Sequence, residues 1–250
     1  MAFASIVLIS GCSEGRFCIA AKGDVVTETI PLEAITGFDL TIAADVNVHY
    51  GEAQEIKVTG ASNIIENLER NVSNGIWEIK NDKCVRKSGK LEIDITIPSL
   101  THAKISGSGN VKGDDAFSGG SNMDLGISGS GNIDLKVDAD VVDIDISGSG
   151  DIALETHANT IKAKLTGSGS IDLTGSCVTE NLSITGSGSV NAFGMVAQDV
   201  TASISGSGNC NINATQSLNV NITGSGSVNY TGTPTVDADI SGSGTLNHVN

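Results

Sequence analysis

Serine between two glycines recurs through the second half of the chain, and a serine hydroxyl serves either as a nucleophile or as a hydrogen-bonding group. The Gly-Ser-Gly motif occurs eight times, and its central residues are Ser108, Ser130, Ser149, Ser168, Ser187, Ser207, Ser225 and Ser243. A catalytic serine needs one histidine and one acid converging on it, whereas these serines are equivalent in every copy. The motif therefore predicts an outward hydrogen-bonding array. The alternative is that small hydroxyls fit beside glycine at a tight corner and bond the local backbone.

A regular hydroxyl array suits two kinds of ligand, glycans and ordered water. Glycan platforms usually include aromatic side chains for stacking, and aromatic residues make up only 3% of this chain. Ice-binding arrays favour threonine, and the central column here is all serine. The sequence therefore predicts a polar surface without naming its ligand.

The residues suited to acid–base chemistry are dispersed. The four histidines are His49, His102, His157 and His248, and no arginine follows Arg86. Enzymes that cleave acidic polysaccharides combine clustered carboxylates, calcium and a basic residue. An enzyme of this kind is the alternative to a non-catalytic function. The sequence predicts no catalytic residue, and we expect the protein not to be an enzyme.

One motif resembles a metal site. The segment 129–135 is similar to the glycine-rich nonapeptides that bind calcium in β-rolls. A ligand ladder would need a carboxylate in every copy, but the column five residues after the first glycine reads Lys112, Asp134, Ala153, Asp172, Asn191, Asn211, Asn229 and Asn247. We therefore predict no metal and no cofactor.

The charge balance narrows the choice of partner. The chain has 29 acidic and 14 basic residues, a net charge of −15. Phosphate backbones repel such a surface, so we expect no nucleic-acid partner. The acidity fits the solubility of a repetitive β protein.

The N-terminus has the composition of an export signal. An apolar run leads to Ile9-Ser10-Gly11-Cys12, which resembles a bacterial lipobox, where the cysteine sulfur receives a diacylglycerol. The run is too short to span a bilayer as a helix, and no basic residue precedes it. We predict a lipoprotein signal peptide over residues 1–12 with Cys12 lipidated, which would attach the exported chain to a membrane through its lipid.

Export permits disulfides. Once Cys12 is lipidated, Cys18 and Cys84 are the only thiols left in the non-repeating part of the chain, and we predict that they pair. Such a bridge is worth about 4 kcal/mol in the chain-entropy model. We expect Cys177 and Cys210 to be free thiols, the second within an aliphatic column.

The spacing of the motif predicts how the chain folds. Successive motifs lie 18 to 22 residues apart, and the positions two before, four before and four after the first glycine are aliphatic, while the odd positions are polar. Alternation with period two predicts strands with one buried face. Identical columns in every strand indicate the stacked parallel coils of a single-stranded β-helix, an all-β solenoid with about 18–20 residues per coil. We assign residues 101–250 to these regular repeats.

Residues 19–100 lack the motif but alternate in the same way. We expect strands at 38–42, 75–79 and 90–97, a short helix at 63–70 capped by Asn63, and Trp77 in the core. This region is predicted to form irregular early coils that cap the stack. The C-terminal coil has no such cap, so homo-oligomerisation through the open end of the solenoid is possible.

The Gly-Ser-Gly-Asn/Asp motifs, together with Thr36–Leu40, Gly51-Glu52, Asn74-Gly75 and Ile97–Leu100, resemble a bacterial family, the putative auto-transporter adhesin, head GIN domain. The resemblance covers about residues 24–250. It implies a right-handed β-helix without catalytic residues, exported or lipid-anchored at the outer membrane, on the cell surface or the periplasmic face. The expected function is that of an adhesin-like binding or scaffolding module for a glycan or a cell-envelope protein; a purely structural envelope component is a further alternative.

Overall fold

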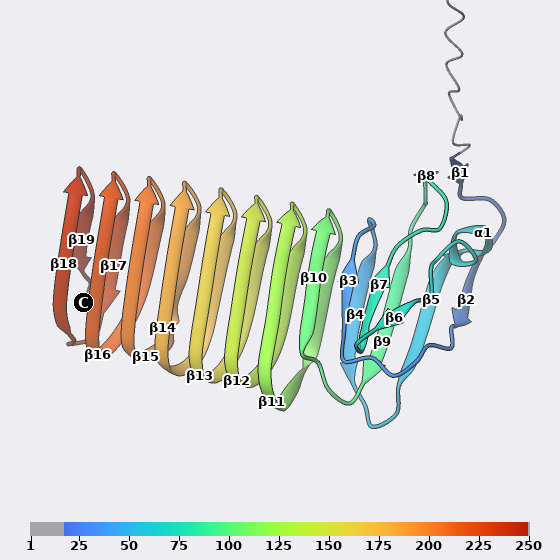
Figure 1. Ribbon diagram of the computed structural model, residues 1–250, viewed down its shortest axis with the longest axis horizontal. Helices are drawn as coiled ribbons and strands as arrows, with labels where there is room; N and C mark the ends of the chain where they lie inside the picture. The colour runs from blue at the N-terminus through green and yellow to red at the C-terminus, as the bar shows by residue number, and fades with distance from the viewer. Residues whose placement is uncertain (1–17, 250) are drawn as a thin grey trace, which may run out of the picture.

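The computed structural model describes residues 18–249. This part of the chain is almost entirely β, and the one helix within it, α1 (Ser62–Ile65), has four residues. Figure 1 shows a long row of stacked coils at one end and a less regular region at the other. No helix within the described residues is long and apolar enough to cross a membrane.

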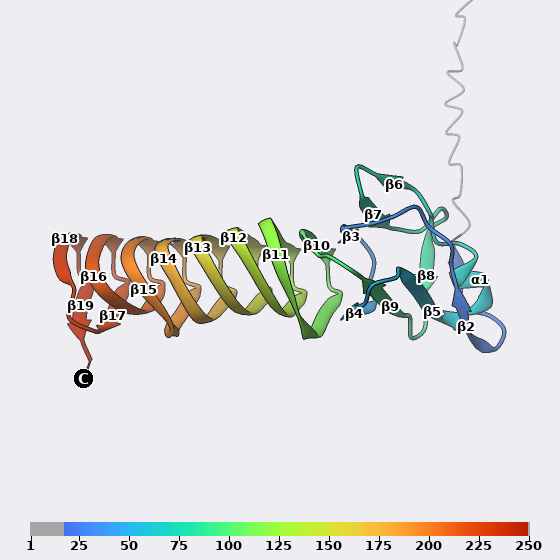
Figure 2. The same cartoon turned by 90° about the horizontal axis from the view of Figure 1, so that it is seen from below.

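The regular part is a parallel β-solenoid, as the repeat predicts. The first half of β16 pairs with β17, and its second half pairs with β18, so each coil runs along one broad face, turns at an edge and returns along the other (Figures 1 and 2). The strands rise on the near face of Figure 1, return on the far face and advance to the left, which is a right-handed winding. The strands of this part are β10 (His102–Gly107), β11 (Asn110–Gly129), β12 (Asn132–Gly148), β13 (Asp151–Gly167), β14 (Ser170–Gly186), β15 (Ser189–Gly206), β16 (Asn209–Gly224), β17 (Ser227–Thr231), β18 (Thr235–Gly242) and β19 (Thr245–His248).

The register confirms the predicted columns. Ile127 pairs with Ile146, which pairs with Leu165, and all three are at most 2% exposed. The side chains between them alternate outward, so one coil buries about six or seven aliphatic groups between its two faces. Each such group stabilises the fold by about 1.5–3 kcal/mol through burial. The core is therefore a thin slab of aliphatic side chains, which explains why few aromatic residues suffice.

The two glycines of each motif have different roles. Gly167, a first glycine, has φ +127, and a Cβ there would overlap the carbonyl oxygen of Gly148 in the preceding coil. Gly150, a second glycine, is buried, and a Cβ there would lie 2.5 Å from Cγ2 of Ile127. The two glycines thus differ in burial, because the second is buried whereas the first forms the bend itself and is only half-buried.

The N-terminal region mixes parallel and antiparallel pairing. Strand β3 pairs with β7 and β10, and β4 pairs with β9 and β11, all in parallel, which continues the stack. Strand β5 instead runs antiparallel to β2 and β9 and closes this end of the solenoid. The strands of this region are β1 (Ile19–Ala20), β2 (Val25–Thr29), β3 (Gly37–Leu40), β4 (Asp45–Tyr50), β5 (Glu55–Ala61), β6 (Val72–Ser73), β7 (Ile76–Ile79), β8 (Val85–Lys87) and β9 (Glu92–Ile97).

Two side chains define the packing of this region. Trp77 is fully buried, and its indole Nε1 donates a hydrogen bond of 3.0 Å to the Glu69 carbonyl oxygen. The sequence suggested Asn63 as the cap of the helix, but Asn63 does not have that role. The helix begins one residue earlier, at Ser62, and has no side-chain cap. The Asn63 amide instead binds the backbone of Ala20 and Lys22, which attaches the N-terminal strand to the cap.

Candidate binding surface

The central serines of the repeat form a column along one edge of the solenoid. The N–H of each serine from Ser130 to Ser243 donates a hydrogen bond of 2.8 to 2.9 Å to the first glycine of the preceding motif. This ladder fixes the serines at one residue per coil, a spacing of about 4.8 Å. All eight are exposed: Ser108, Ser130, Ser149, Ser168, Ser187, Ser207, Ser225 and Ser243.

A second hydroxyl column lies two residues earlier in each motif, and its eight members are also exposed: Ser106, Ser128, Ser147, Thr166, Thr185, Ser205, Thr223 and Ser241. Within residues 18–249, none of the sixteen hydroxyls in the two columns is hydrogen-bonded to the protein. They therefore do not bond the local backbone, and they are open to solvent or a ligand. Because the first glycine bends the chain between the two columns, the array wraps the edge and is not flat.

The broad face that ends at this edge carries a hollow of about 430 Å³ that the sequence analysis did not anticipate. Its lining alternates acidic and basic side chains from β10 to β14, and the residues are Lys104, Asp124, Asp143, Ile144, Asp145, Lys162, Ala163, Lys164, Asn181 and Ser183. The charges come from the outward columns three and five residues before the first glycine. Because these columns contain acidic, basic and uncharged residues in different coils, the repeat does not predict the hollow.

The charges in this hollow are paired between neighbouring coils. Lys104 Nζ lies 2.6 Å from Asp124 Oδ2, and Lys164 Nζ lies 3.6 Å from Asp145 Oδ2. The His102 ring lies between carboxylates, with 2.8 Å to Asp39 and 3.2 Å to Asp124. Carboxylates, amines and an imidazole thus line one face, and such groups bind polar ligands and can transfer protons.

The last four residues of the column five positions after the first glycine, Asn191, Asn211, Asn229 and Asn247, form an asparagine ladder. Asn229 Nδ2 donates to Asn211 Oδ1 at 3.0 Å, and Asn247 Nδ2 donates to Asn229 Oδ1 at 3.0 Å. The amides thus satisfy one another from coil to coil, as in stacked polar ladders. No group of three or more potential metal ligands occurs within residues 18–249.

One carboxyl group lies in the aliphatic core. Glu180 stands in register between Ile161 and Val200, is fully buried, and has no hydrogen-bond partner on either oxygen. Burial raises the pKa of Glu180 to about 8, because a charge without a partner is unfavourable in an apolar medium. The column six residues before each first glycine is aliphatic in the neighbouring coils, so the sequence did contain the signal for this residue.

The two cysteines of the repeats are buried and unpaired. Desolvation, with a smaller contribution from Glu180, raises the pKa of Cys177 to about 12. The same two causes raise the pKa of Cys210 well above its usual range. Neither thiol is therefore a thiolate near neutral pH, which removes them as nucleophiles.

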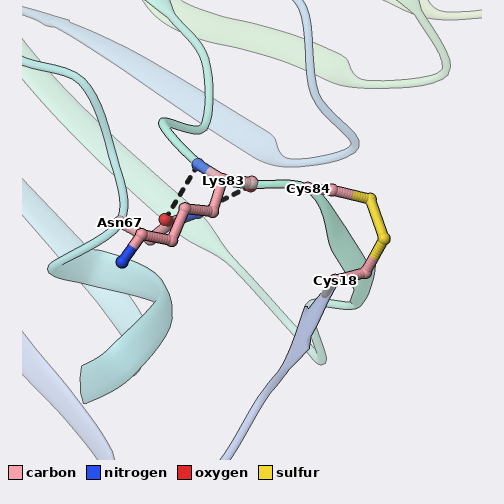
Figure 3. The surroundings of a disulfide bond; sticks show 4 residues. All are labelled: Cys18, Asn67, Lys83 and Cys84. Atoms are coloured by element: carbon pink, nitrogen blue, oxygen red, sulfur yellow. Dashed lines mark hydrogen bonds between the residues drawn. A yellow bond between two sulfur atoms is a disulfide. The ribbon is translucent and has the colours of Figure 1, made fainter. Parts of the chain in front are cut away.

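The structure joins Cys18 and Cys84 in a disulfide bond that closes 66 residues (Figure 3). Beside the bridge, the buried Asn67 side chain exchanges two hydrogen bonds of 3.0 Å with the backbone of Lys83. The bridge also lies beside the two-stranded sheet of β1 and β8. Cys12, the predicted lipidation site, lies outside the described residues.

Within residues 18–249, no strand packs on the outer side of the C-terminal coil. Every residue of β18 is exposed, and Ile240, an inward residue by its column, is 38% exposed. The Tyr230 and His248 rings stack at 4.8 Å between centroids, and the His248 ring lies 3.0 Å from the Gly232 carbonyl oxygen.

The stacked coils and their outward polar columns define a parallel β-helix protein. The chain belongs to the family described as "Putative auto-transporter adhesin, head GIN domain", which it matches over residues 36–172 and 144–234. Membership indicates an exported or cell-surface protein with an adhesin-like role. No curated protein matches the chain.

Solved structures share the fold along nearly the whole chain. A putative adhesin from Parabacteroides merdae is 23% identical with a TM-score of 0.89, covering 93% of this chain and 99% of its own. A putative lipid binding protein from Parabacteroides distasonis is 25% identical with a TM-score of 0.87 and the same coverage. A putative adhesin from Bacteroides fragilis is 23% identical with a TM-score of 0.68, covering 92% of this chain and 100% of its own.

Proposed function

We propose that the protein is an exported, outer-membrane lipoprotein, anchored through Cys12, that acts as a non-catalytic adhesin-like binding or scaffolding module. The observation that carries the proposal is the double column of sixteen exposed hydroxyls without protein partners along one edge of the solenoid. A glycan or a cell-envelope protein with regularly spaced polar groups fits this edge. The fixed spacing matters because donors held in place lose little entropy on binding.

A binding screen tests this proposal. The full chain carrying Cys12→Ser, which cannot be lipidated, is tested on a glycan array and against solubilised envelope proteins. A bound ligand should lose affinity with the triple variant S149A/S168A/S187A, which removes hydroxyls from the edge. The control is S176A/S183A/S203A, which removes exposed hydroxyls elsewhere on the solenoid. The absence of any ligand argues for a purely structural envelope component, whereas an equal loss in both triples argues against the hydroxyl edge as the binding surface.

The charged hollow favours a second function, an enzyme acting on polysaccharide. Asp143, Asp145, Lys162 and Lys164 lie in one hollow of about 430 Å³, and carboxylates with a neighbouring base are the groups that such cleavage requires. Incubation with acidic and neutral polysaccharides, followed by measurement of new reducing ends, distinguishes the two. Cleavage that D143N/D145N abolishes would establish the enzyme and exclude the non-catalytic proposal.

The open C-terminal coil supports one further part of the proposal, self-association. Strand β18 is exposed along its whole length, and such an edge can pair with a second copy. Analytical ultracentrifugation of the Cys12→Ser chain should show a dimer that Ile240→Lys dissociates. A monomer at all concentrations refutes this part and leaves the adhesin-like role intact.

A further inference from the structure

The basic residues of the chain are unevenly paired. Eight of the thirteen described lysines and arginines have a carboxylate oxygen within 4.0 Å, including every one from Lys90 to Lys164. The remaining five, all exposed, are Lys22, Arg70, Lys83, Arg86 and Lys87. Cations on the solenoid are thus neutralised locally, and those without a carboxylate partner are confined to the N-terminal region.

Four of these five lie around the disulfide. Lys83 precedes Cys84 directly, Arg86 and Lys87 belong to β8, and Lys22 follows β1, which pairs with β8. We name these four residues the basic tip. Asp24 and Asp82 are the acidic residues in the same two segments, 18–24 and 82–88, so the local net charge is +2, against −15 for the whole chain.

A hollow opens beside the tip. It has a volume of about 320 Å³, with Arg86, Asn81 and Ser88 as polar lining and Ile42 and Leu91 among the apolar lining. The Ser88 hydroxyl donates to the Gly89 carbonyl oxygen, so the Arg86 guanidinium and the Asn81 amide are the donors available to a phosphate. The apolar wall suits the hydrocarbon that adjoins a lipid headgroup.

Chain length brings this tip close to the predicted anchor. Cys12 precedes Cys18 by six positions, and six residues span at most about 21 Å when fully extended. A lipid on Cys12 would therefore hold the tip within roughly two Debye lengths of the membrane surface. Figure 1 shows β1 and β8 at the point where the chain enters the N-terminal region, with the solenoid extending away from it.

We propose that the basic tip docks onto the anionic phospholipid headgroups of the membrane that holds the anchor, while the acidic solenoid is repelled and extends away from it. The inference rests on the proposed anchor at Cys12 for its location, but not on the ligand of the hydroxyl edge. Lys83, Arg86 and Lys87 supply the attraction, and the hollow beside Arg86 receives a headgroup phosphate.

Vesicle binding without the lipid tests the proposal. The full chain with Cys12→Ser and an intact disulfide is sedimented at low salt with vesicles of phosphatidylcholine, with or without phosphatidylglycerol. Each basic residue beside an anionic surface adds roughly fivefold to affinity, so K83Q/R86Q/K87Q should weaken binding on the order of 100-fold. The matched control K57Q/K112Q/K136Q makes the same charge change at exposed lysines outside the basic tip and should leave binding unchanged, as should the charge-preserving K83R/K87R.

The results of this experiment distinguish docking onto anionic lipid from nonspecific binding and from binding of a free anion. Binding that requires phosphatidylglycerol and is lost only in the tip variant supports the proposal. No preference for phosphatidylglycerol, or equal losses in the tip and control variants, overturns it. Binding of inorganic phosphate without any binding to phosphatidylglycerol vesicles would assign the hollow to a free anion, which also overturns the membrane role. None of these results depends on whether a glycan binds the hydroxyl edge.

Discussion

Replacing Glu180 by glutamine should make the protein more stable at alkaline pH. The folded protein holds this proton up to a pKa of about 8, whereas the unfolded chain releases it near 4.5. Between these values the folded state binds more protons, so the free energy of unfolding falls as pH rises. The loss amounts to about 5 kcal/mol by pH 8. Glutamine cannot ionise, so Glu180→Gln should match the native chain near pH 4 and exceed it above pH 8.

Thermal unfolding followed by circular dichroism at pH 4.5 and pH 8.5 measures this difference. We expect Glu180→Gln to raise Tm at pH 8.5 by on the order of 10 °C and to change it little at pH 4.5. Asp134→Asn, which removes an exposed carboxylate two coils away, should leave the pH dependence unchanged. An equal Tm difference between Glu180→Gln and the native chain at both pH values would refute the assignment of a buried, partnerless acid.

Three further expectations concern the backbone bend, the thiols and the bridge. Gly167→Ala should destabilise the fold by about 2–4 kcal/mol, because φ there is +127 and a Cβ meets backbone; Gly120→Ala, whose Cβ has only a contact of 3.9 Å, is the control in urea unfolding. Cys177 and Cys210 should resist alkylation by iodoacetamide at pH 8 in the native state and react fully in urea. Mass spectrometry measures the alkylation. Rapid alkylation of the native protein would contradict the burial of these thiols. Cys84→Ser should cost about 4 kcal/mol and increase hydrogen exchange chiefly in the N-terminal region, and uniform exchange would instead show that the bridge stabilises the whole solenoid.

The sequence was sufficient for the solenoid because its information is local and repeated. Columns such as Ile127, Ile146 and Leu165 are readable by alignment of the chain with itself, and stacking is the arrangement that buries all of them. The antiparallel pairing of β5 was not readable, since a non-repeating strand gives no clue to its partner. The wrapped shape of the hydroxyl array was missed because it depends on the backbone angle at the first glycine.

Only the repeated part of the candidate site could be predicted from the sequence. The exposed serine column follows from the motif, whereas the charged hollow depends on which of several polar residues stands in each coil. Glu180 is readable from the sequence in principle, because its column contains one acid among aliphatic residues. A column-by-column comparison of every position would have found the buried acid but not the hollow.

The one-to-one register of the coils makes the length of this molecule adjustable. Each coil contacts only the coil before and the coil after it, so removal of a whole repeat, such as residues 151–169, leaves equivalent neighbours to rejoin. The rod would shorten by about 4.8 Å for each repeat lost and lengthen by the same step for each repeat gained. The distance between the N-terminal region and the last coil can thus change in fixed increments through duplication or deletion of a single repeat, without redesign of any contact.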